Sequence, residues 1–167
     1  MEIHGCSPRL WDAFKQYHYL SHSIPPNCDC YAAVINGQPV GFLAVTHGIG
    51  KTIYYRVSRV VVLPDYQGIG IGTRLSDWLG SILSGAGYRY YSRTSHPAMI
   101  AHRRRSLLWQ TIAEMGFTST PTSASSKVRR TWRGQMGRLA ASFRYVGPTM
   151  DPQKAVQLLT DARRVAV

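Results

Sequence analysis

Glycines at positions 68, 70 and 72 follow closely on an apolar, β-branched run, Val60–Leu63. A strand that passes through a glycine-rich turn into a helix leaves several backbone N–H groups without partners at the helix N-terminus. Those groups and the positive end of the helix dipole attract a phosphate or pyrophosphate. Glycine removes the Cβ atoms that would block its approach. The segment Val60–Gly72 therefore predicts a binding site for a phosphate-containing ligand.

Two other glycine-rich turns do not fit this segment. A Rossmann turn has the order Gly-x-Gly-x-x-Gly and an acidic residue about 20 positions further on. Here the order is Gly-x-Gly-x-Gly, and residues 90–93 include no acid. A P-loop needs Gly-Lys-Ser or Gly-Lys-Thr, which the turn lacks. A tight turn without a ligand is the alternative that the residues alone leave open.

From Val60 to Gly72 the sequence follows the pattern Val-x-Val-x-Pro-x-x-Gln-x-x-Gly-x-Gly. This pattern resembles the cofactor motif of the GNAT N-acetyltransferases, and the order of elements over residues 1–147 is similar too. The resemblance implies acetyl-CoA, or another acyl-CoA, as cofactor. It also implies that backbone groups of the strand pair with the pantetheine arm and that amides of the turn hold the pyrophosphate. The cofactor-binding residues expected on this basis are Val60, Val61, Val62, Gln67, Gly68, Ile69, Gly70, Gly72 and Thr73.

Two residues that the resemblance implies are missing. GNAT enzymes often carry a Glu on the strand before the turn, where this chain has Arg56, Ser58 and Arg59. Many also carry a Tyr five residues before the Phe of a Gly-Phe pair, but counting back from Phe117 leads to Ile112. A modest base is sufficient for an amine that is uncharged at pH 7, such as an aromatic amine of a nucleobase. The missing Glu therefore favours an acceptor other than lysine.

Two histidine-bearing stretches are candidates for proton transfer. His18 and Tyr19 lie where the first helix is expected to end, and His22 follows them. Ser95 and His96 lie where a strand is expected to pass into the next helix. Histidine exchanges a proton near neutral pH, and tyrosine can donate one. Each stretch also has a structural explanation, because His18 can simply end a helix and Ser95 can cap one.

The chain is strongly basic, with 20 Lys and Arg against 8 Asp and Glu, a net charge of +12 and a pI near 10.1. Coenzyme A accounts for only a few of these charges, so nucleic acid, either DNA or RNA, is predicted as a partner. Arginine predominates, which suits bidentate phosphate contacts, and interleaved aromatic residues could stack on bases. A charged face that only contacts solvent is the alternative. The predicted nucleic-acid-binding residues are Arg103, Arg104, Arg105, Lys127, Arg129, Arg130 and Arg133.

The pair His18-Tyr19 and the basic surface also resemble the phage DNA-modification enzyme Mom, and a duplex base would have to be extruded to react in such a cleft. Three hypotheses follow. The main one is an acyl-CoA-dependent, GNAT-type N-acyltransferase that modifies a nucleic-acid base amine. The second is an N-acetyltransferase of a protein or small-molecule amine. The third is an inactive GNAT-fold module that binds nucleic acid or acts as an inhibitor.

The elements that must position these residues form one domain, because 167 residues are too few for two full cores. We expect an α/β (α+β) fold of the GNAT type, with a single mixed, mostly antiparallel sheet that splays in a V between its central strands and is flanked by helices. The domain is expected to cover residues 1–147, and a C-terminal helix in residues 148–167 to pack on it or trail from it. A helix is expected to begin at Ser7, and the strands and helices expected after it are Tyr31–Ile35, Val40–Thr46, Ile53–Leu63, Thr73–Leu83 (helix), Tyr88–Thr94, Pro97–Glu114 (helix), Val128–Arg133, Leu139–Val146 and Pro152–Arg164 (helix).

The cysteines and the apolar runs exclude several other classes. Cys6, Cys28 and Cys30 are too few for a disulfide framework, and their spacing is not that of a zinc site, so no metal is predicted. No apolar run reaches the roughly 18 residues of a membrane span. The first ten residues lack the basic and then apolar order of a signal peptide. We therefore expect a cytoplasmic protein with reduced thiols.

Overall fold

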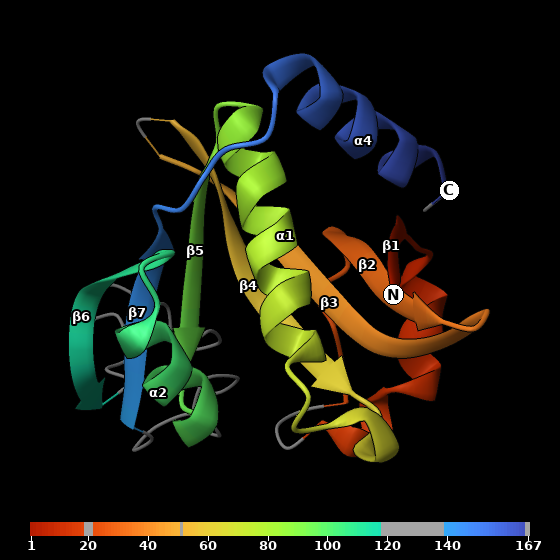
Figure 1. Cartoon of the computed structure of the whole chain (residues 1–167), viewed down its shortest axis with the longest axis horizontal. Coiled ribbons are helices and arrows are strands. Elements are labelled where there is room, and N and C mark those ends of the chain that lie inside the picture. The colour runs from red at the N-terminus through yellow and green to blue at the C-terminus, as the bar shows by residue number, and fades with distance from the viewer. Residues whose placement is uncertain (19–21, 51, 118–138, 166–167) are drawn as a thin grey trace, which may run out of the picture.

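The computed structural model describes residues 1–18, 22–50, 52–117 and 139–165. Their strands form one sheet in the order β1-β2-β3-β4-β5-β7-β6 (Figure 1). All neighbouring strands are antiparallel except β4 and β5, which are parallel. This is the mixed, mostly antiparallel sheet that the sequence predicts. The strands are β1 (Glu2–Gly5), β2 (Cys28–Ile35), β3 (Gln38–Ile49), β4 (Ile53–Val62), β5 (Arg89–Thr94), β6 (Trp109–Phe117) and β7 (Leu139–Tyr145).

Helices cover both faces of the sheet. The longest described helix, α1, crosses the face of the sheet that is toward the viewer in Figure 1. Helix α4 lies at the upper edge of the molecule, beside the C-terminal end of α1. Two short 3-10 helices near the N-terminus pack on the opposite face, against β2 and β3. The helical elements are η1 (Pro8–Ala13), η2 (Lys15–Tyr17), η3 (Pro64–Tyr66), α1 (Ile71–Gly85), α2 (Pro97–Arg105) and α4 (Pro152–Val165).

The middle of strand β3, Val40–Val45, is buried at every position and has no polar side chain. Leu43 and Val45 point to the face of α1 and join the larger core cluster. Phe42 points the other way and packs against Trp11 and Phe14 of the N-terminal segment. A strand that is buried on both faces needs apolar residues at every position. Each fully buried side chain of this kind contributes about 1.5–3 kcal/mol.

The predicted splay lies between β4 and β5. These strands pair only over Tyr54–Arg56 and Arg89–Tyr91. Beyond that seam they diverge toward the N-terminal end of α1 (Figure 1). The rest of β4, from Val57 to Val62, has β3 as its partner on one side and no described strand on the other.

The hairpin between β2 and β3 is also as predicted. Asn36 has a φ of 50° and Gly37 a φ of 76°, which are the left-handed conformations that a tight two-residue hairpin turn requires.

The prediction of a helix over Pro97–Glu114 is right up to Arg105 and wrong beyond it. Helix α2 ends at Arg105, and the chain enters β6 at Trp109. The Trp109 indole is 5% exposed, packs against Tyr90 and Tyr145, and donates a hydrogen bond to Asp77. An extended chain from Trp109 places this ring in the core, and that packing overrides local helix propensity.

Three further differences concern the ends of the chain and the last strands. The single helix expected from Ser7 is a pair of 3-10 helices, and β1 has no counterpart among the expected strands. Strand β7 confirms the strand expected at Leu139–Val146, but it pairs with β5 and β6. Its expected partner, Val128–Arg133, lies outside the described residues.

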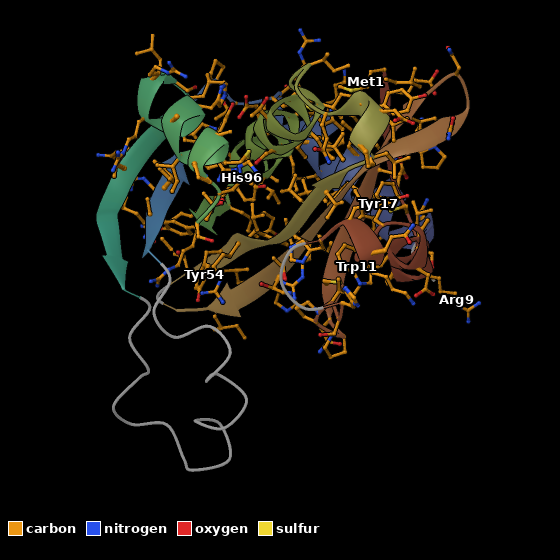
Figure 2. All side chains as sticks on the ribbon, turned by 90° about the horizontal axis from the view of Figure 1, so that it is seen from below. Met1, Arg9, Trp11, Tyr17, Tyr54 and His96 are labelled. Atoms are coloured by element: carbon orange, nitrogen blue, oxygen red, sulfur yellow. The ribbon has the colours of Figure 1, made fainter. Side chains whose placement is uncertain are left out.

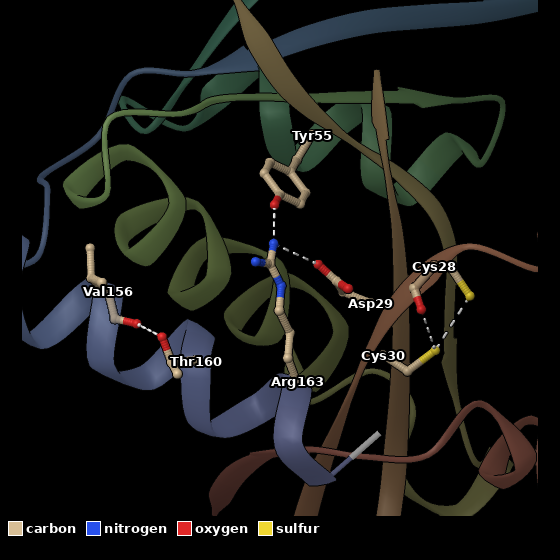
Figure 3. A network of polar contacts seen from close by, with 7 residues as sticks. All are labelled: Cys28, Asp29, Cys30, Tyr55, Val156, Thr160 and Arg163. Atoms are coloured by element: carbon tan, nitrogen blue, oxygen red, sulfur yellow. Dashed lines mark hydrogen bonds and ion pairs between the residues drawn. The ribbon is translucent and has the colours of Figure 1, made fainter. Parts of the chain in front are cut away.

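The C-terminal helix α4 packs on α1 and returns to β1 and β2. Near its end, Arg163 donates hydrogen bonds to the Tyr55 hydroxyl and to Asp29, whose Oδ2 lies 3.4 Å away (Figure 3). Figure 3 also shows the Sγ atoms of Cys28 and Cys30, which lie 3.5 Å apart. All the cysteines are free thiols, and the described residues contain no group of side chains that could hold a metal ion.

Candidate functional site

A cleft with a volume of about 610 Å³ opens in the splay between β4 and β5. The glycine turn lies at one end, and the wall beside β5 comes from α2. The described residues that line it are Tyr17, His18, Val57–Val62, Tyr66, Gln67, Gly68, Gly70–Thr73, Ser92–Thr94, His96, Ala98, Met99, His102 and Arg103. The cleft therefore joins the glycine turn to both histidine-bearing stretches.

A β-bulge in β4 shapes the middle of the cleft. Ala44 of β3 is opposite Arg59, while the next residue of β3, Val45, is opposite Val57, so Ser58 is the extra residue. The four residues from Val57 to Val60 are all partly exposed, because the bulge breaks the alternation of the strand.

The backbone of β4 beyond the bulge points in alternate directions. The Leu63 N–H donates to Val40 of β3 at 2.9 Å, so the backbone groups of Val62 point the other way, into the splay. The Val62 carbonyl there accepts a hydrogen bond from the Gln67 side chain at 2.8 Å. By the same alternation the groups of Val60 also point into the splay, and those of Val61 toward β3. The edge of β4 thus offers the Val62 N–H and both polar groups of Val60 to a ligand.

The glycine turn leaves space in front of the first turn of α1. Gly68 has a φ of 82° and Gly70 a φ of 86°. A Cβ added to Gly68 would meet no atom within 4 Å, and one added to Gly70 only the Thr73 hydroxyl, at 3.5 Å. That hydroxyl donates to the Gly70 carbonyl at 2.7 Å. The open space, positive φ angles and free helix N-terminus fit a pyrophosphate.

The wall opposite β5 comes from the N-terminal segment. His18 is 7% exposed, and its ring makes an edge contact with Trp11 at a centroid distance of 5.6 Å. Tyr17, beside it, is 43% exposed. Arg59 donates to the Ser23 carbonyl at 2.8 Å and so ties β4 to the loop that follows this segment. In Figure 2, Tyr17 lies beside the N-terminal helices and His96 beside α2, with β4 passing between them.

These residues belong to a recognisable domain. Residues 26–107, which include the glycine turn, the bulged strand and α2, match the family model of the acetyltransferase (GNAT) domain. The chain contains a GNAT acetyltransferase domain. The domain is thereby assigned to the acetyl-CoA-dependent N-acetyltransferases.

Solved structures share the fold of this GNAT domain. The ribosomal-protein-S18-alanine N-acetyltransferase of Escherichia coli superposes with a TM-score of 0.61 at 20% identity, over 89% of this chain and 94% of that one. NAA60 of Arabidopsis thaliana, in complex with acetyl-CoA, gives a TM-score of 0.62 at 13% identity, over 86% and 97%. An IAA acetyltransferase of Bacillus cereus gives 0.52 at 16%, over 71% and 77%. No curated protein sequence matches the chain, and nothing in the comparisons supports the likeness to Mom.

The GNAT domain brings together most of the residues predicted for the cofactor and some of those predicted for catalysis. His18 and His96 both line the cleft. Ser95 and Ile69 are not among its lining residues, and Tyr19 lies outside the described residues. His22 is exposed, and its backbone carbonyl accepts a hydrogen bond from Trp11. Nothing in the sequence indicated the bulge, because a bulge depends on the register with β3.

The predicted basic face is only partly described. Arg104 and Arg105 are exposed at the end of α2. Arg103 was predicted to bind nucleic acid, and this is wrong because its side chain is 1% exposed and points into the protein. Arg103 stands in an unbroken run of basic residues, so the sequence gives no sign that its side chain is buried. The other predicted residues, Lys127, Arg129, Arg130 and Arg133, lie outside the described residues.

No helix in the described parts of the chain is both long and apolar enough to cross a membrane.

Proposed function

We propose that this chain transfers an acetyl group from acetyl-CoA to an amine of low basicity, such as the α-amino group of a polypeptide. The observation that carries the proposal is the edge of β4 that β5 leaves unpaired beyond Arg56. This edge lines a cleft that also contains the glycine turn and His18. A ligand along the edge has its phosphates at the turn and its reactive end beside an imidazole.

The residues that would hold the acyl donor are those of the turn and of the unpaired edge. Backbone amides of Gln67–Thr73 at the start of α1 would bind the pyrophosphate, and Val60 and Val62 would pair with the pantetheine arm. The bound donor supplies a thioester carbonyl as the electrophile. The Val62 N–H points into the splay, while the side chain of Gln67 occupies the carbonyl of the same residue. The strand therefore offers a hydrogen-bond donor to a developing oxyanion.

His18 would accept the proton of the acceptor amine. It is buried in the wall of the cleft, and the strand that carries Arg59 in place of a carboxylate offers no acidic base. An α-amino group has a pKa of about 7.7–8.0, against about 10.4 for lysine. An imidazole is therefore a strong enough base for an α-amine acceptor, since a useful fraction of the α-amine is already uncharged near pH 7. The Escherichia coli protein of the same fold is named for an alanine of ribosomal protein S18.

The experiment compares two peptides with acetyl-CoA and the full chain. One has a free α-amine and no lysine; the other has a blocked N-terminus and one lysine. Mass spectrometry should show acetylation of the first only. His18→Gln should slow that reaction by about 10²–10⁴-fold, the usual contribution of a general base. His22→Gln, which changes an exposed histidine outside the cleft, is the matched control and should react normally.

Acetylation of the lysine peptide alone would refute the assignment of the acceptor. Equal rates for the two histidine variants would refute the role of His18.

A second candidate is the amine of a nucleobase, as the main hypothesis from the sequence has it. The observation that favours it is a basic, aromatic face opposite α1. Arg56 and Arg93 are exposed there, and Tyr54 and Tyr91 make an edge contact at a centroid distance of 5.7 Å. Such a surface suits phosphates and stacked bases. DNA and RNA in the same assay test it, and their binding should weaken steeply with salt.

A flat salt response or unchanged nucleosides would remove this second candidate and leave the acetyl transfer to amines in place.

A further inference from the structure

Under the β5 wall of the cleft lies the most deeply buried charge of the described chain, the guanidinium of Arg103. It donates hydrogen bonds to the hydroxyls of Ser92 and Ser76, the second at 3.1 Å. Its Cζ lies 4.3 Å from the centre of the Trp109 ring. Among the described residues, no carboxylate oxygen lies within ion-pair distance of it. The nearest acid in the network is Asp77, whose Oδ1 accepts the Trp109 N–H at 2.7 Å.

A buried cation without a direct ion pair is costly, and the environment favours its loss of a proton. Burial lowers the pKa of Arg103 to about 10, while the nearby Tyr90 and Asp77 act in the opposite direction. The guanidinium therefore still carries its charge at pH 7. An anion that arrives in the cleft next to it gains from that charge in a poorly solvated place.

Ser92 connects this charge to the cleft. Ser92 and Arg103 are both lining residues of the cleft, whereas Ser76 is not. A guanidinium can only donate hydrogen bonds, so the Ser92 oxygen accepts, and the hydrogen of its hydroxyl remains for another partner. Within the described residues, the Ser92 hydroxyl makes one hydrogen bond, the one that it accepts from Arg103. A cation thus holds the Ser92 oxygen at the edge of the cleft, and the hydroxyl keeps its own hydrogen for a ligand there.

We propose that Ser92 donates a hydrogen bond to the sulfur that leaves during acetyl transfer, and that Arg103 is the positioning residue that orients the hydroxyl and favours the thiolate. The inference rests on the proposed function. In that reaction the C–N bond forms and the C–S bond breaks, and the electron pair of the C–S bond passes to sulfur. The amine proton passes to the base in the cleft and, through solvent, to sulfur. Ser92 thus takes over the role at the leaving group for which the sequence offers no tyrosine.

The test measures the binding of coenzyme A and of its analogue with hydrogen in place of the thiol, between pH 7 and pH 10. Every titrating group of the protein acts on both ligands, so the ratio of the two dissociation constants reports the sulfur alone. The titratable and charged groups around Arg103 are Asp77, Tyr90, His102 and Tyr145, and those that line the cleft are Tyr17, His18, Arg59, Tyr66, Arg93 and His96.

The wild-type protein should bind coenzyme A more tightly than the analogue as the pH rises toward the ordinary thiol pKa of about 8.5. The ratio should change by up to about tenfold for each unit by which the bound thiol's pKa is lowered. Ser92→Ala should reduce this change severalfold. Ser76→Ala is the matched control, because it removes a hydroxyl from the same guanidinium outside the cleft, and it should keep the wild-type profile. Arg103→Lys keeps the positive charge but loses the paired N–H donors of the guanidinium, and it should give an intermediate profile.

The same pH profile for both ligands in the wild type would overturn the inference. The inference would also be overturned if Ser76→Ala reduced the pH-dependent change in the ratio as much as Ser92→Ala does. That result would show that the network around Arg103 has only a structural role. No binding of either ligand would instead refute the proposed function, on which the inference rests.

Discussion

Replacing Gly68 by Asp adds one negative charge in front of the predicted pyrophosphate site without a steric clash. Gly68 has a φ of 82°, and an added Cβ would meet no atom within 4 Å. Asp adopts such backbone conformations more readily than most residues, at a cost of about 1–2 kcal/mol. Gly37, in the β2–β3 hairpin, has a φ of 76° and equally open surroundings. Gly37→Asp is therefore a control with a similar backbone cost in a different turn, which does not line the cleft.

The effect on coenzyme A follows from the added charge. A carboxylate roughly 6 Å from one phosphate charge costs about 0.7–2.8 kcal/mol at an effective dielectric constant between 80 and 20. That corresponds to a dissociation constant raised roughly 3- to 100-fold. Gly68→Asn has the same shape without the charge and should lose much less affinity.

Thermal unfolding with and without coenzyme A measures this loss. A ligand at 100 times its dissociation constant stabilises the folded state by about 2.7 kcal/mol. If Gly68→Asp weakens binding about 100-fold, the same concentration contributes only about 0.4 kcal/mol. The placement of the pyrophosphate is refuted if Gly68→Asp keeps the full ligand-induced shift, or if Gly37→Asp loses as much of it.

The other predictions concern the free energy of unfolding, measured with urea. Arg163→Met should lose about 1 kcal/mol because its hydrogen bonds tie α4 to the sheet, whereas Arg164→Met, at an exposed pair, should lose under about 0.5; equal losses would contradict the tether. Gly80→Ala should destabilise by about 1–2 kcal/mol despite its better helix propensity, because the new Cβ would lie 2.5 Å from the Tyr145 ring, and a stabilised variant would contradict this. Burial raises the pKa of Asp77 above its ordinary value, so the stabilising contribution of this carboxyl is present below that value and lost as pH rises through the folded-state pKa. Asp77→Asn should therefore gain stability relative to wild type as pH rises from about 3 to 7; a pH-independent difference would contradict the shift.

The backbone preferences of neighbouring residues made several elements in the middle of this chain predictable from the sequence. The hairpin at Asn36-Gly37 and the strand that runs into the turn at Gly68 follow from residues adjacent in sequence, whose backbone preferences the fold merely uses. The same holds for α1, whose apolar residues repeat at helical spacing. In such segments local preference and tertiary packing agree.

The errors lie where distant residues decide the outcome. Trp109 ends a plausible helix because its indole fits between Tyr90 and Tyr145, which are remote from it in sequence. Arg103 looks like one of a run of surface arginines, and only the hydroxyls of α1 and β5 explain why it alone is buried. The bulge at Ser58 likewise depends on the register with β3. Each is a tertiary feature without a local sequence pattern.

The short seam between β4 and β5 has a consequence for how the protein behaves in concentrated solution. A strand edge with unsatisfied backbone groups is a template for pairing with another chain, and proteins normally place such edges at the rim and protect them with charges. Here one runs through the centre of the sheet along Val57–Val62, with Arg59 as its single charged residue. The Gln67 side chain already occupies the Val62 carbonyl of this edge, and the walls of the cleft flank the rest of it. A pantetheine arm along this edge would act as a protective strand, so we expect the ligand-free protein to self-associate more readily than the ligand-bound form.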